Sequence, residues 1–245
     1  MEDIFKKYSL LYGLNVPRET YKDFERFISL IIDKNNKINL ISKKTAKNKD
    51  IRERHIIDSA QAIDFIDLNG NTTYDIGSGS GLPGIVIAII AKKLKKKTKF
   101  KLYEKSYRKS SFLREVSQKL NLDIKVIQED IFKTSNLKSG TIMARAFKPL
   151  PVVLDLVHTN FNSYNNLIIF MGKNGKQVVK EASKKWDFEY KEKRSLTSED
   201  SFLLNIKNIK KKKLNKTQII SVINQKGGVG KTTTVINLAC GLSQQ

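Results

Sequence analysis

The sequence predicts an α/β protein in which a parallel sheet carries helices on both faces. An antiparallel hairpin closes one edge, and a helical cap precedes the first strand. From about residue 72, short apolar strands alternate with segments of helical periodicity, which is the pattern of a parallel sheet. The first strand ends in Asp75-Ile-Gly-Ser-Gly-Ser-Gly-Leu-Pro-Gly84, and an apolar helix follows. A strand, a glycine turn and a helix in this order are typical of a nucleotide-type cofactor site.

The helical segments come first along the chain. Residues 2–12, 18–39 and 50–67 carry apolar side chains at helical spacing, which predicts an N-terminal helical cap over residues 1–70. A sheet domain is predicted at 71–209. Its strands are expected at 72–76, 98–103, 123–128, 140–145 and 165–171, and its helices at 84–96, 107–121, 150–160 and 174–185. The closing strands, expected at 186–194 and 201–208, have no helix between them, so we expect them to form the antiparallel edge hairpin.

The composition suggests a partner and a compartment. The formal net charge is +22, from 46 basic and 24 acidic residues, which favours nucleic acid as a partner. Because Lys, Asn and Ile are abundant, the compositional drift of an AT-rich genome is the alternative source of this charge. The single cysteine, Cys240, excludes an intrachain disulfide, and the uncharged apolar stretch at 84–91 is too short to span a membrane. Because the N-terminus is charged where a signal peptide would be apolar, we expect a cytoplasmic protein without membrane contact.

Two cofactors compete for the glycine loop. The spacing Gly79-x-Gly81-x-x-Gly84, with Glu104 about 20 residues further on, matches the dinucleotide fingerprint and would suit a nicotinamide-dependent oxidoreductase. The pattern Asp75-x-Gly77-x-Gly79-x-Gly81 fits S-adenosylmethionine at least as well. In that case Asp75 meets the ammonium group of the cofactor, directly or through water, and Glu104 accepts both ribose hydroxyls. The loop alone leaves both cofactors open.

The surrounding residues favour the methyl donor. Arg54-His55-x-x-Asp58-Ser59, the glycine loop, Glu104-Lys-Ser-x-Arg-Lys-x-x-Phe-Leu113 and Ala144-Arg145-Ala146 occur in this order. The set resembles the small-subunit ribosomal RNA methyltransferase G family, also called glucose-inhibited division protein B, from about residue 20 to 205. The resemblance implies a Rossmann-like, class I S-adenosylmethionine-dependent methyltransferase fold. It also implies methyl transfer to N7 of a guanosine in 16S ribosomal RNA, position 527 in the family's name.

The resemblance also assigns residues to the cofactor and the substrate. It places cofactor contacts at Gly77, Leu82, the pair Gln128-Glu129 and Arg145, beside Asp75, Gly79, Gly81 and Glu104 from the loop pattern. Arg54, His55 and Lys173 are the expected substrate contacts. Purely structural roles are the alternative for three of these residues: a surface position for Arg54, a satisfied helix histidine for His55, and an ion pair with an acidic neighbour for Arg145.

The chemistry expected of such an enzyme is simple. Guanine N7 has an exposed lone pair, so no proton has to leave before it attacks. We expect no covalent intermediate, no metal and no obligatory general base, and therefore no catalytic side chain beyond those that position the reactants. The target base must leave its stack to reach a pocket. The expected partner is 16S ribosomal RNA or the 30S subunit, and we expect a monomer.

The C-terminal segment contains a second glycine-rich loop. After a basic linker predicted at 210–216, Gln225-Lys-Gly-Gly-Val-Gly-Lys231-Thr232-Thr233 matches a P-loop, in which Lys231 would reach phosphates and Thr232 would hold Mg²⁺. Residues 217–245 resemble the start of a ParA-type chromosome-partitioning ATPase. The strand expected at 218–224 and one helix cannot bury a core, so we expect an incomplete P-loop fragment without ATP hydrolysis. An ATP-driven partitioning protein is the alternative function that this loop suggests.

Overall fold

The computed structural model describes residues 4–42, 45–213 and 226–243. The chain divides into two compact units, Met1–Lys212 and Lys213–Gln245. The first unit contains both the predicted helical cap and the predicted sheet domain. The strand predicted at 218–224 lies outside the described residues.

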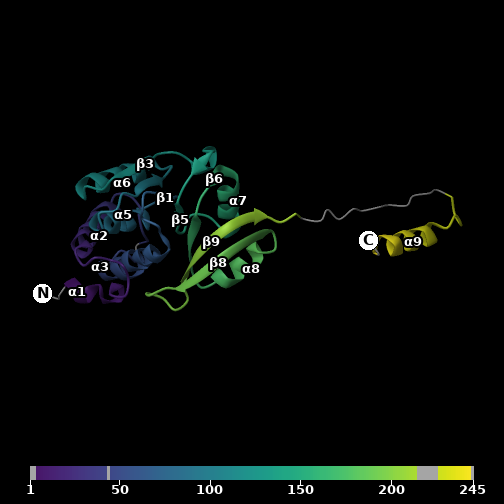
Figure 1. Cartoon of the computed structure of the whole chain (residues 1–245), viewed down its shortest axis with the longest axis horizontal. Helices are drawn as coiled ribbons and strands as arrows, with labels where there is room; N and C mark the ends of the chain where they lie inside the picture. Colours follow the sequence, from purple (N-terminus) through teal and green to yellow (C-terminus); the bar gives the residue numbers. More distant parts are fainter. Residues whose placement is uncertain (1–3, 43–44, 214–225, 244–245) are drawn as a thin grey trace. The chain divides into compact units, whose positions relative to one another are not determined.

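The main sheet of the described residues has seven strands in the order β3-β2-β1-β5-β7-β9-β8. The strands are β1 (Thr72–Ile76), β2 (Lys99–Tyr103), β3 (Ile124–Ile127), β5 (Thr141–Ala144), β7 (Asn166–Met171), β8 (Trp186–Arg194) and β9 (Phe202–Lys211). The first five pair in parallel, whereas β9 pairs antiparallel with both β7 and β8. This arrangement confirms the predicted parallel sheet with an antiparallel edge hairpin (Figure 1).

Asp75 in β1 is aligned with Leu102 of β2 on one side and with Met143 of β5 on the other. The glycine loop after β1 therefore leaves the sheet between β2 and β5, at the point where the order of strands reverses. Open parallel sheets bind their ligands at such a point, outside the carboxyl ends of the strands.

The helices of the sheet domain also follow the prediction. They are α5 (Gly84–Lys93), α6 (Tyr107–Lys119), α7 (Leu150–Asn160) and α8 (Gly175–Ala182). Figure 1 shows α5 and α6 on one face of the sheet, together with α2 (Thr20–Asn35), and α7 and α8 on the other face. None of the helices in the described ranges is long and apolar enough to cross a membrane.

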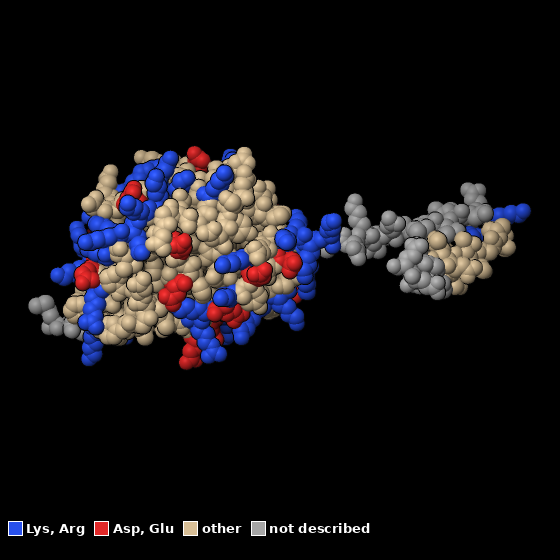
Figure 2. All heavy atoms as spheres, in the orientation of Figure 1, with Lys and Arg blue, Asp and Glu red and all other residues tan. Residues whose placement is uncertain are grey.

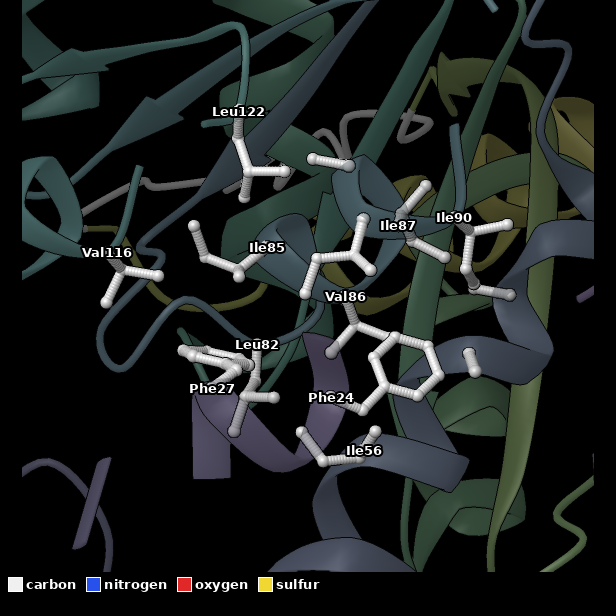
Figure 3. Packing of buried hydrophobic residues seen from close by; sticks show 14 of the residues in the cluster. Phe24, Phe27, Ile56, Leu82, Ile85, Val86, Ile87, Ile90, Val116 and Leu122 are labelled. Carbon is white, nitrogen blue, oxygen red and sulfur yellow. The ribbon is translucent and has the colours of Figure 1, made fainter. Parts of the chain in front are cut away.

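The N-terminal helices and the sheet domain share one core. All residues from Gly84 to Ala91 of α5 are buried, because the helix lies between the sheet and the N-terminal segment. Figure 3 shows Phe24 and Phe27 of α2 with Ile56 packed against Val86 and its neighbours in α5. A helix that is apolar all round is stable only when it is covered on every side. The cap is thus part of the fold of the first unit.

The structure differs from the predicted elements in four respects. The helix predicted at 2–12 is divided into α1 (Ile4–Lys7) and a 3₁₀ segment Ser9–Leu11. The helix predicted at 50–67 consists of α3 (Asn48–Ile51), a π-helical segment Arg52–Ile57, α4 (Asp58–Ala60) and a 3₁₀ segment Gln61–Phe65. A small two-stranded sheet of β4 (Leu137–Lys138) and β6 (Phe161–Ser163) was not predicted, because strands this short leave almost no periodicity in the sequence. Finally, β9 continues to Lys211, past the predicted end of its strand.

Candidate active site

The carboxyl ends of four parallel strands surround a cavity of about 500 Å³. Its walls are the glycine loop after β1, the end of β2, the segment after β3, and the turn after β5. Ile41 and His55 of the N-terminal helical region complete the lining. The size is that of a small-molecule site, and its place in the sheet is the one expected for a cofactor.

The glycines of the loop serve different purposes. Gly77 has a φ of +72°, and a Cβ built on it would lie 2.0 Å from Cδ2 of Phe147. An L side chain there is strained and has no space. A Cβ on Gly81 would lie 2.5 Å from Cγ1 of Ile85, so Gly81 permits contact between loop and helix and does not line the cavity. Gly79 lines the cavity, and the nearest atom to its Cβ position is 3.8 Å away. Its backbone is therefore open to a ligand.

Glu104 follows β2 and holds the glycine loop in place. Its Oε2 accepts a hydrogen bond from the backbone N–H of Gly79 at 2.9 Å, and its Oε1 accepts one from the N–H of Ser106 at 2.8 Å. The side chain is buried and lines the cavity. A carboxylate oxygen can accept more than one hydrogen bond, so Glu104 retains acceptor capacity for a hydroxyl group in the cavity.

Asp75 lies beneath the loop and does not line the cavity. Its Oδ2 accepts a hydrogen bond from the backbone N–H of Gly84 at 3.0 Å, at the start of α5. Its Oδ1 has no hydrogen-bond partner among the described residues. Burial raises the pKa of Asp75 to about 7, against the lowering effect of the Gly84 hydrogen bond. The expected contact between Asp75 and the cofactor's ammonium group stays a prediction.

Arg145 connects the end of β5 to the N-terminal helices. Its guanidinium forms an ion pair with Asp58 Oδ2 at 3.0 Å and donates a hydrogen bond to the backbone carbonyl of Arg54 at 2.5 Å. Burial lowers the pKa of Arg145 and raises the pKa of Asp58. The structure thus contains the ion pair considered for Arg145, while Arg145 also lines the cavity. One side chain joins the cavity wall to the π-helical segment.

His55 belongs to the π-helical segment and lines the first cavity. Its Nε2 lies 3.2 Å from Thr45 Oγ1. Burial, and then the positive charges of Arg145 and Arg54, lower the pKa of His55 to about 4. The imidazole is therefore neutral near pH 7. Arg54 itself is exposed and does not line the cavity, and its Nε lies 3.8 Å from Oδ1 of Asp50.

A second cavity, of about 370 Å³, opens on the other side of the turn after β5. It lies at the carboxyl ends of β5 and β7 and at the starts of α7 and α8. Lys173 is part of its lining. Three consecutive residues, Ala146, Phe147 and Lys148, line both cavities. The two cavities therefore share a wall, and that wall is a single loop.

The structure brings most of the predicted site residues together. The first cavity is lined by Gly77, Gly79, Leu82, Glu104, Glu129, Arg145 and His55. Asp75, Gly81, Gln128 and Arg54 do not line it, and Lys173 belongs to the second cavity. Sequence reasoning missed Ile41, Phe132 and Phe147. Phe147 directly follows the Ala-Arg-Ala motif at a strand end, which is the signal that could have identified it.

The second unit also contains an organised glycine loop. Gly228 and Gly230 have φ values of +71° and +70°, and α9 (Lys231–Ser243) follows directly. Lys231 Nζ donates a hydrogen bond to the backbone carbonyl of Lys226 at 2.8 Å. The described residues of this segment thus form a glycine loop with two left-handed glycines, followed by one helix.

Comparisons with known proteins agree with the geometry. A family profile described as rRNA small subunit methyltransferase G matches residues 20–206, and one described as an AAA domain matches residues 217–245. A ribosomal RNA small subunit methyltransferase G from Pelagibacter ubique is 63% identical over 212 residues, which are 86% of this chain and 100% of that protein. One from Ruegeria pomeroyi is 34% identical over 193 residues, 79% of this chain and 93% of that protein. The structure of the mitomycin 7-O-methyltransferase MmcR aligns with a TM-score of 0.50 at 12% identity, covering 73% of this chain and 60% of that one, which shows likeness of fold alone.

Proposed function

The chain belongs to the rRNA small subunit methyltransferase G family, and from this premise we propose that its first cavity serves guanine-N7 methylation of 16S ribosomal RNA. The protein is an S-adenosylmethionine-dependent rRNA methyltransferase with a Rossmann-like class I fold. The observation that carries the proposal for the site is that the open backbone of Gly79 and the carboxylate of Glu104 face one cavity at the switch point of the sheet. The family's own target, position 527, is the proposed site of methylation.

The residues of the first cavity fit S-adenosylmethionine. Glu104 would accept hydrogen bonds from the ribose hydroxyls, and Glu129 would lie at the adenine edge. Gly77 and Leu82 would adjoin the methionine end, and Arg145 supplies a positive charge to the same cavity. The unpartnered Oδ1 of Asp75 is a buried acceptor that a water-mediated ammonium group would satisfy. When bound, the cofactor supplies a methyl group that its sulfonium already activates.

The protein's task in this reaction is to position the base. The lone pair of guanine N7 is free to attack, so no side chain has to remove a proton. His55 agrees with this, because a histidine whose pKa is about 4 is a weak base and carries no charge near pH 7. The walls of the cavity hold the reactants in line and exclude water, which converts the encounter into an effectively intramolecular step.

The comparisons bear differently on the two alternative functions, an oxidoreductase and an ATP-driven partitioning protein. Family membership and the class of cofactor remove the nicotinamide-dependent oxidoreductase. The AAA profile matches residues 217–245, whereas the Pelagibacter relative is matched over its whole length by 86% of this chain. We propose that methyl transfer belongs to the first unit alone. Deletion of residues 214–245 should leave methyl transfer unchanged, and loss of transfer in a folded deletion variant would contradict this assignment.

The surface suits a polyanionic substrate. On the face shown in Figure 2, Lys and Arg side chains are dense over the part of the first unit that contains α2 and α6, with fewer acidic side chains among them. Lys105, Lys109 and Lys148 line the first cavity. We propose that these lysines contact phosphates of 16S RNA or the 30S subunit, so that binding weakens steeply with salt. A cytoplasmic monomer is the state proposed for this activity.

Transfer of a tritiated methyl group from S-adenosylmethionine to 16S RNA and to 30S subunits tests the proposal. The expected result is incorporation at one guanosine, located by cleavage of the RNA at N7-methylguanosine. RNA in which that guanosine is replaced by adenosine is the control and should accept no label. Failure of a folded protein that binds S-adenosylmethionine to label either substrate would overturn the proposed function.

A further inference from the structure

We propose that Ser195, in the tip of the β8–β9 hairpin (residues 195–201), is a positioning residue for cofactor binding, because it fixes the carboxylate of Asp58 that holds Arg145 in the wall of the first cavity. The inference rests on the proposed function, since it takes the first cavity as the cofactor site. The sequence predicts the hairpin only as the edge of the sheet and assigns no role to Ser195. Ser195 itself does not line the cavity, so it acts through Asp58.

The hydroxyl of Ser195 joins the hairpin to the N-terminal helices. Ser195 directly follows the end of β8 at Arg194, and its Oγ donates a hydrogen bond to Oδ1 of Asp58 at 3.0 Å. The same Oγ accepts a hydrogen bond from the backbone N–H of Thr197 at 3.1 Å, so the hydroxyl is held on both sides. The other oxygen of Asp58, Oδ2, forms the ion pair with Arg145 at 3.0 Å. One carboxylate therefore connects the hairpin tip to the wall of the first cavity.

Gln61 joins the same two elements a second time. Its buried side chain donates a hydrogen bond from Nε2 to Oδ1 of Asp58 at 2.7 Å, and its Oε1 accepts one from the backbone N–H of Leu196 at 3.2 Å. A carboxylate on one side and an N–H group on the other determine which way the amide points. Oδ1 of Asp58 therefore receives two hydrogen bonds, one from the hairpin tip and one from a side chain that the tip holds in place.

These donors give Asp58 the orientation that its ion pair needs. The side chains of Arg145 and Asp58 are only 16% and 13% exposed, and a pair this far from water is stable only when its remaining lone pairs and protons find partners. Burial raises the pKa of Asp58, whereas the charge of Arg145 and then the hydrogen bonds from Ser195 and Gln61 lower it. Without the Ser195 hydroxyl, one of the two hydrogen bonds that aim the carboxylate is lost, and Arg145 is held less closely. Small displacements of this kind matter in a site whose task is to position the reactants.

The hairpin has a second attachment that does not involve Asp58. Lys193 Nζ donates a hydrogen bond to the backbone carbonyl of Gln61 at 3.1 Å and forms an ion pair with Asp64. The strands of the hairpin are themselves paired along their length. Removal of the Ser195 hydroxyl should therefore leave the hairpin folded and attached to the helices, and change only the contacts of Asp58. A positioning role can thus be separated from a role in fastening the hairpin.

Ser195→Ala tests the inference, and Ser198→Ala is the matched control. Ser198 lies in the same tip, and its Oγ accepts a hydrogen bond from Ser201 Oγ at 3.1 Å, within the tip itself. Isothermal titration with S-adenosylmethionine measures the Kd and the binding-competent fraction of the protein separately. For Ser195→Ala we expect the Kd to rise about 3- to 30-fold, because only part of the contribution of a charged hydrogen bond is passed on to the cofactor. Ser198→Ala, and Ser195→Thr, which keeps the hydroxyl, should bind with the wild-type Kd. A purely structural role of Ser195 would instead lower Tm and the binding-competent fraction and leave the Kd unchanged.

Asp58→Asn shows whether Ser195 acts through Asp58. Asn keeps an acceptor oxygen for Ser195 and Gln61, but it has no charge with which to pair with Arg145. Adding Ser195→Ala to Asp58→Asn should therefore raise the Kd by less than about twofold, because residues that act through one contact have effects that do not add.

The outcomes separate the inference from the proposed function. The inference is wrong if Ser195→Ala binds S-adenosylmethionine with the wild-type Kd, if Ser198→Ala weakens binding as much, or if the effects of Ser195→Ala and Asp58→Asn add in full. None of these results affects the proposed function, which requires only that the wild-type protein methylates 16S RNA. If the wild-type protein binds the cofactor but labels no RNA, the proposed function fails while the calorimetric test of Ser195 still decides the inference. If the wild-type protein does not bind S-adenosylmethionine, both are overturned.

Discussion

Replacement of Glu104 by Gln tests whether one carboxylate both organises the glycine loop and binds the cofactor. In the structure, the two oxygens of Glu104 accept backbone hydrogen bonds from Gly79 at 2.9 Å and Ser106 at 2.8 Å. Gln has nearly the same shape but only one acceptor oxygen. In either orientation of the amide, its NH₂ group would face a backbone N–H. One of the two donors then loses its partner in a buried place.

The size of the effect follows from these contacts. A hydrogen bond to a charged group contributes about 1.5–3 kcal/mol, and leaving its buried partner unsatisfied has a cost of similar size. We expect Glu104→Gln to lower the free energy of unfolding by about 2–3 kcal/mol. For a domain of this size that corresponds to a decrease in Tm of about 4–12 °C. The affinity for S-adenosylmethionine should fall about 10- to 150-fold, because the ribose hydroxyls lose a charged acceptor.

Glu129→Gln is the matched control for this variant. It removes the same charge from the lining of the same cavity, but Glu129 is exposed. Its unfolding free energy should stay within about 0.5 kcal/mol of the wild type. Urea unfolding measures the stability of both variants, and isothermal titration with S-adenosylmethionine measures the affinity. The reasoning is refuted if Glu104→Gln is as stable as Glu129→Gln and binds the cofactor as tightly as the wild type.

Three further predictions concern the same region. Gly77→Ala should lower the free energy of unfolding by about 1–2 kcal/mol through backbone strain, and should weaken cofactor binding because its methyl group meets Phe147. Adding Phe147→Ala in the same chain should restore part of the lost stability and affinity. Denaturation measures the first and calorimetry the second. Burial raises the pKa of Asp75 from 3.8 to about 7, so its contribution to stability is present below about pH 4 and is lost as pH rises to about 7. Urea unfolding at pH 5 and pH 8 measures this. Relative to the wild type, the free energy of unfolding of Asp75→Asn should be higher at pH 8 than at pH 5. The pKa of His55 is lowered from 6.5 to about 4, so the sign is opposite. Its contribution is present above pH 6.5 and is lost as pH falls towards 4, a loss that His55→Gln should lack, and methyl transfer should show no inflection near pH 6.5.

The sequence predicted the elements that local pattern controls. The strands and helices from residue 72 to residue 194 lie within a few residues of their expected bounds, because apolar strands and helices alternate there with clear turn signals. The association of the glycine loop with Glu104 was also predictable, since both follow neighbouring parallel strands. Adjacent strand ends meet at one edge of the sheet. The bounds of the elements and the association of the loop with Glu104 could both be predicted, because each depends on short segments of sequence.

The features that sequence reasoning missed depend on contacts between distant segments. The π-helical segment Arg52–Ile57 is joined to Arg145 by the hydrogen bond to the Arg54 carbonyl, from the opposite half of the chain. The left-handed conformation of Ala146 has no signal in the sequence, because glycine or asparagine is the usual residue there. Phe147 could be placed at the cavity wall only once the conformation of Ala146 was known. Helical periodicity could not separate α3, the π-helical segment and α4, since all three are helical and each contributes buried residues.

The turn after β5 explains why these missed features occur together. Arg145 reaches the π-helical segment and the wall that contains His55, whereas Phe147, two residues later, lies against Gly77 on the glycine loop. Two neighbouring side chains that contact such different partners require an abrupt change of backbone direction between them, and Ala146 with its positive φ makes that change. The same turn separates the two cavities. The strain at Ala146 is therefore maintained by contacts on both sides, from the N-terminal helices through Arg145 and from the cofactor loop through Phe147. A change in either set of contacts should therefore alter the lining of both cavities, because residues 146–148 belong to both.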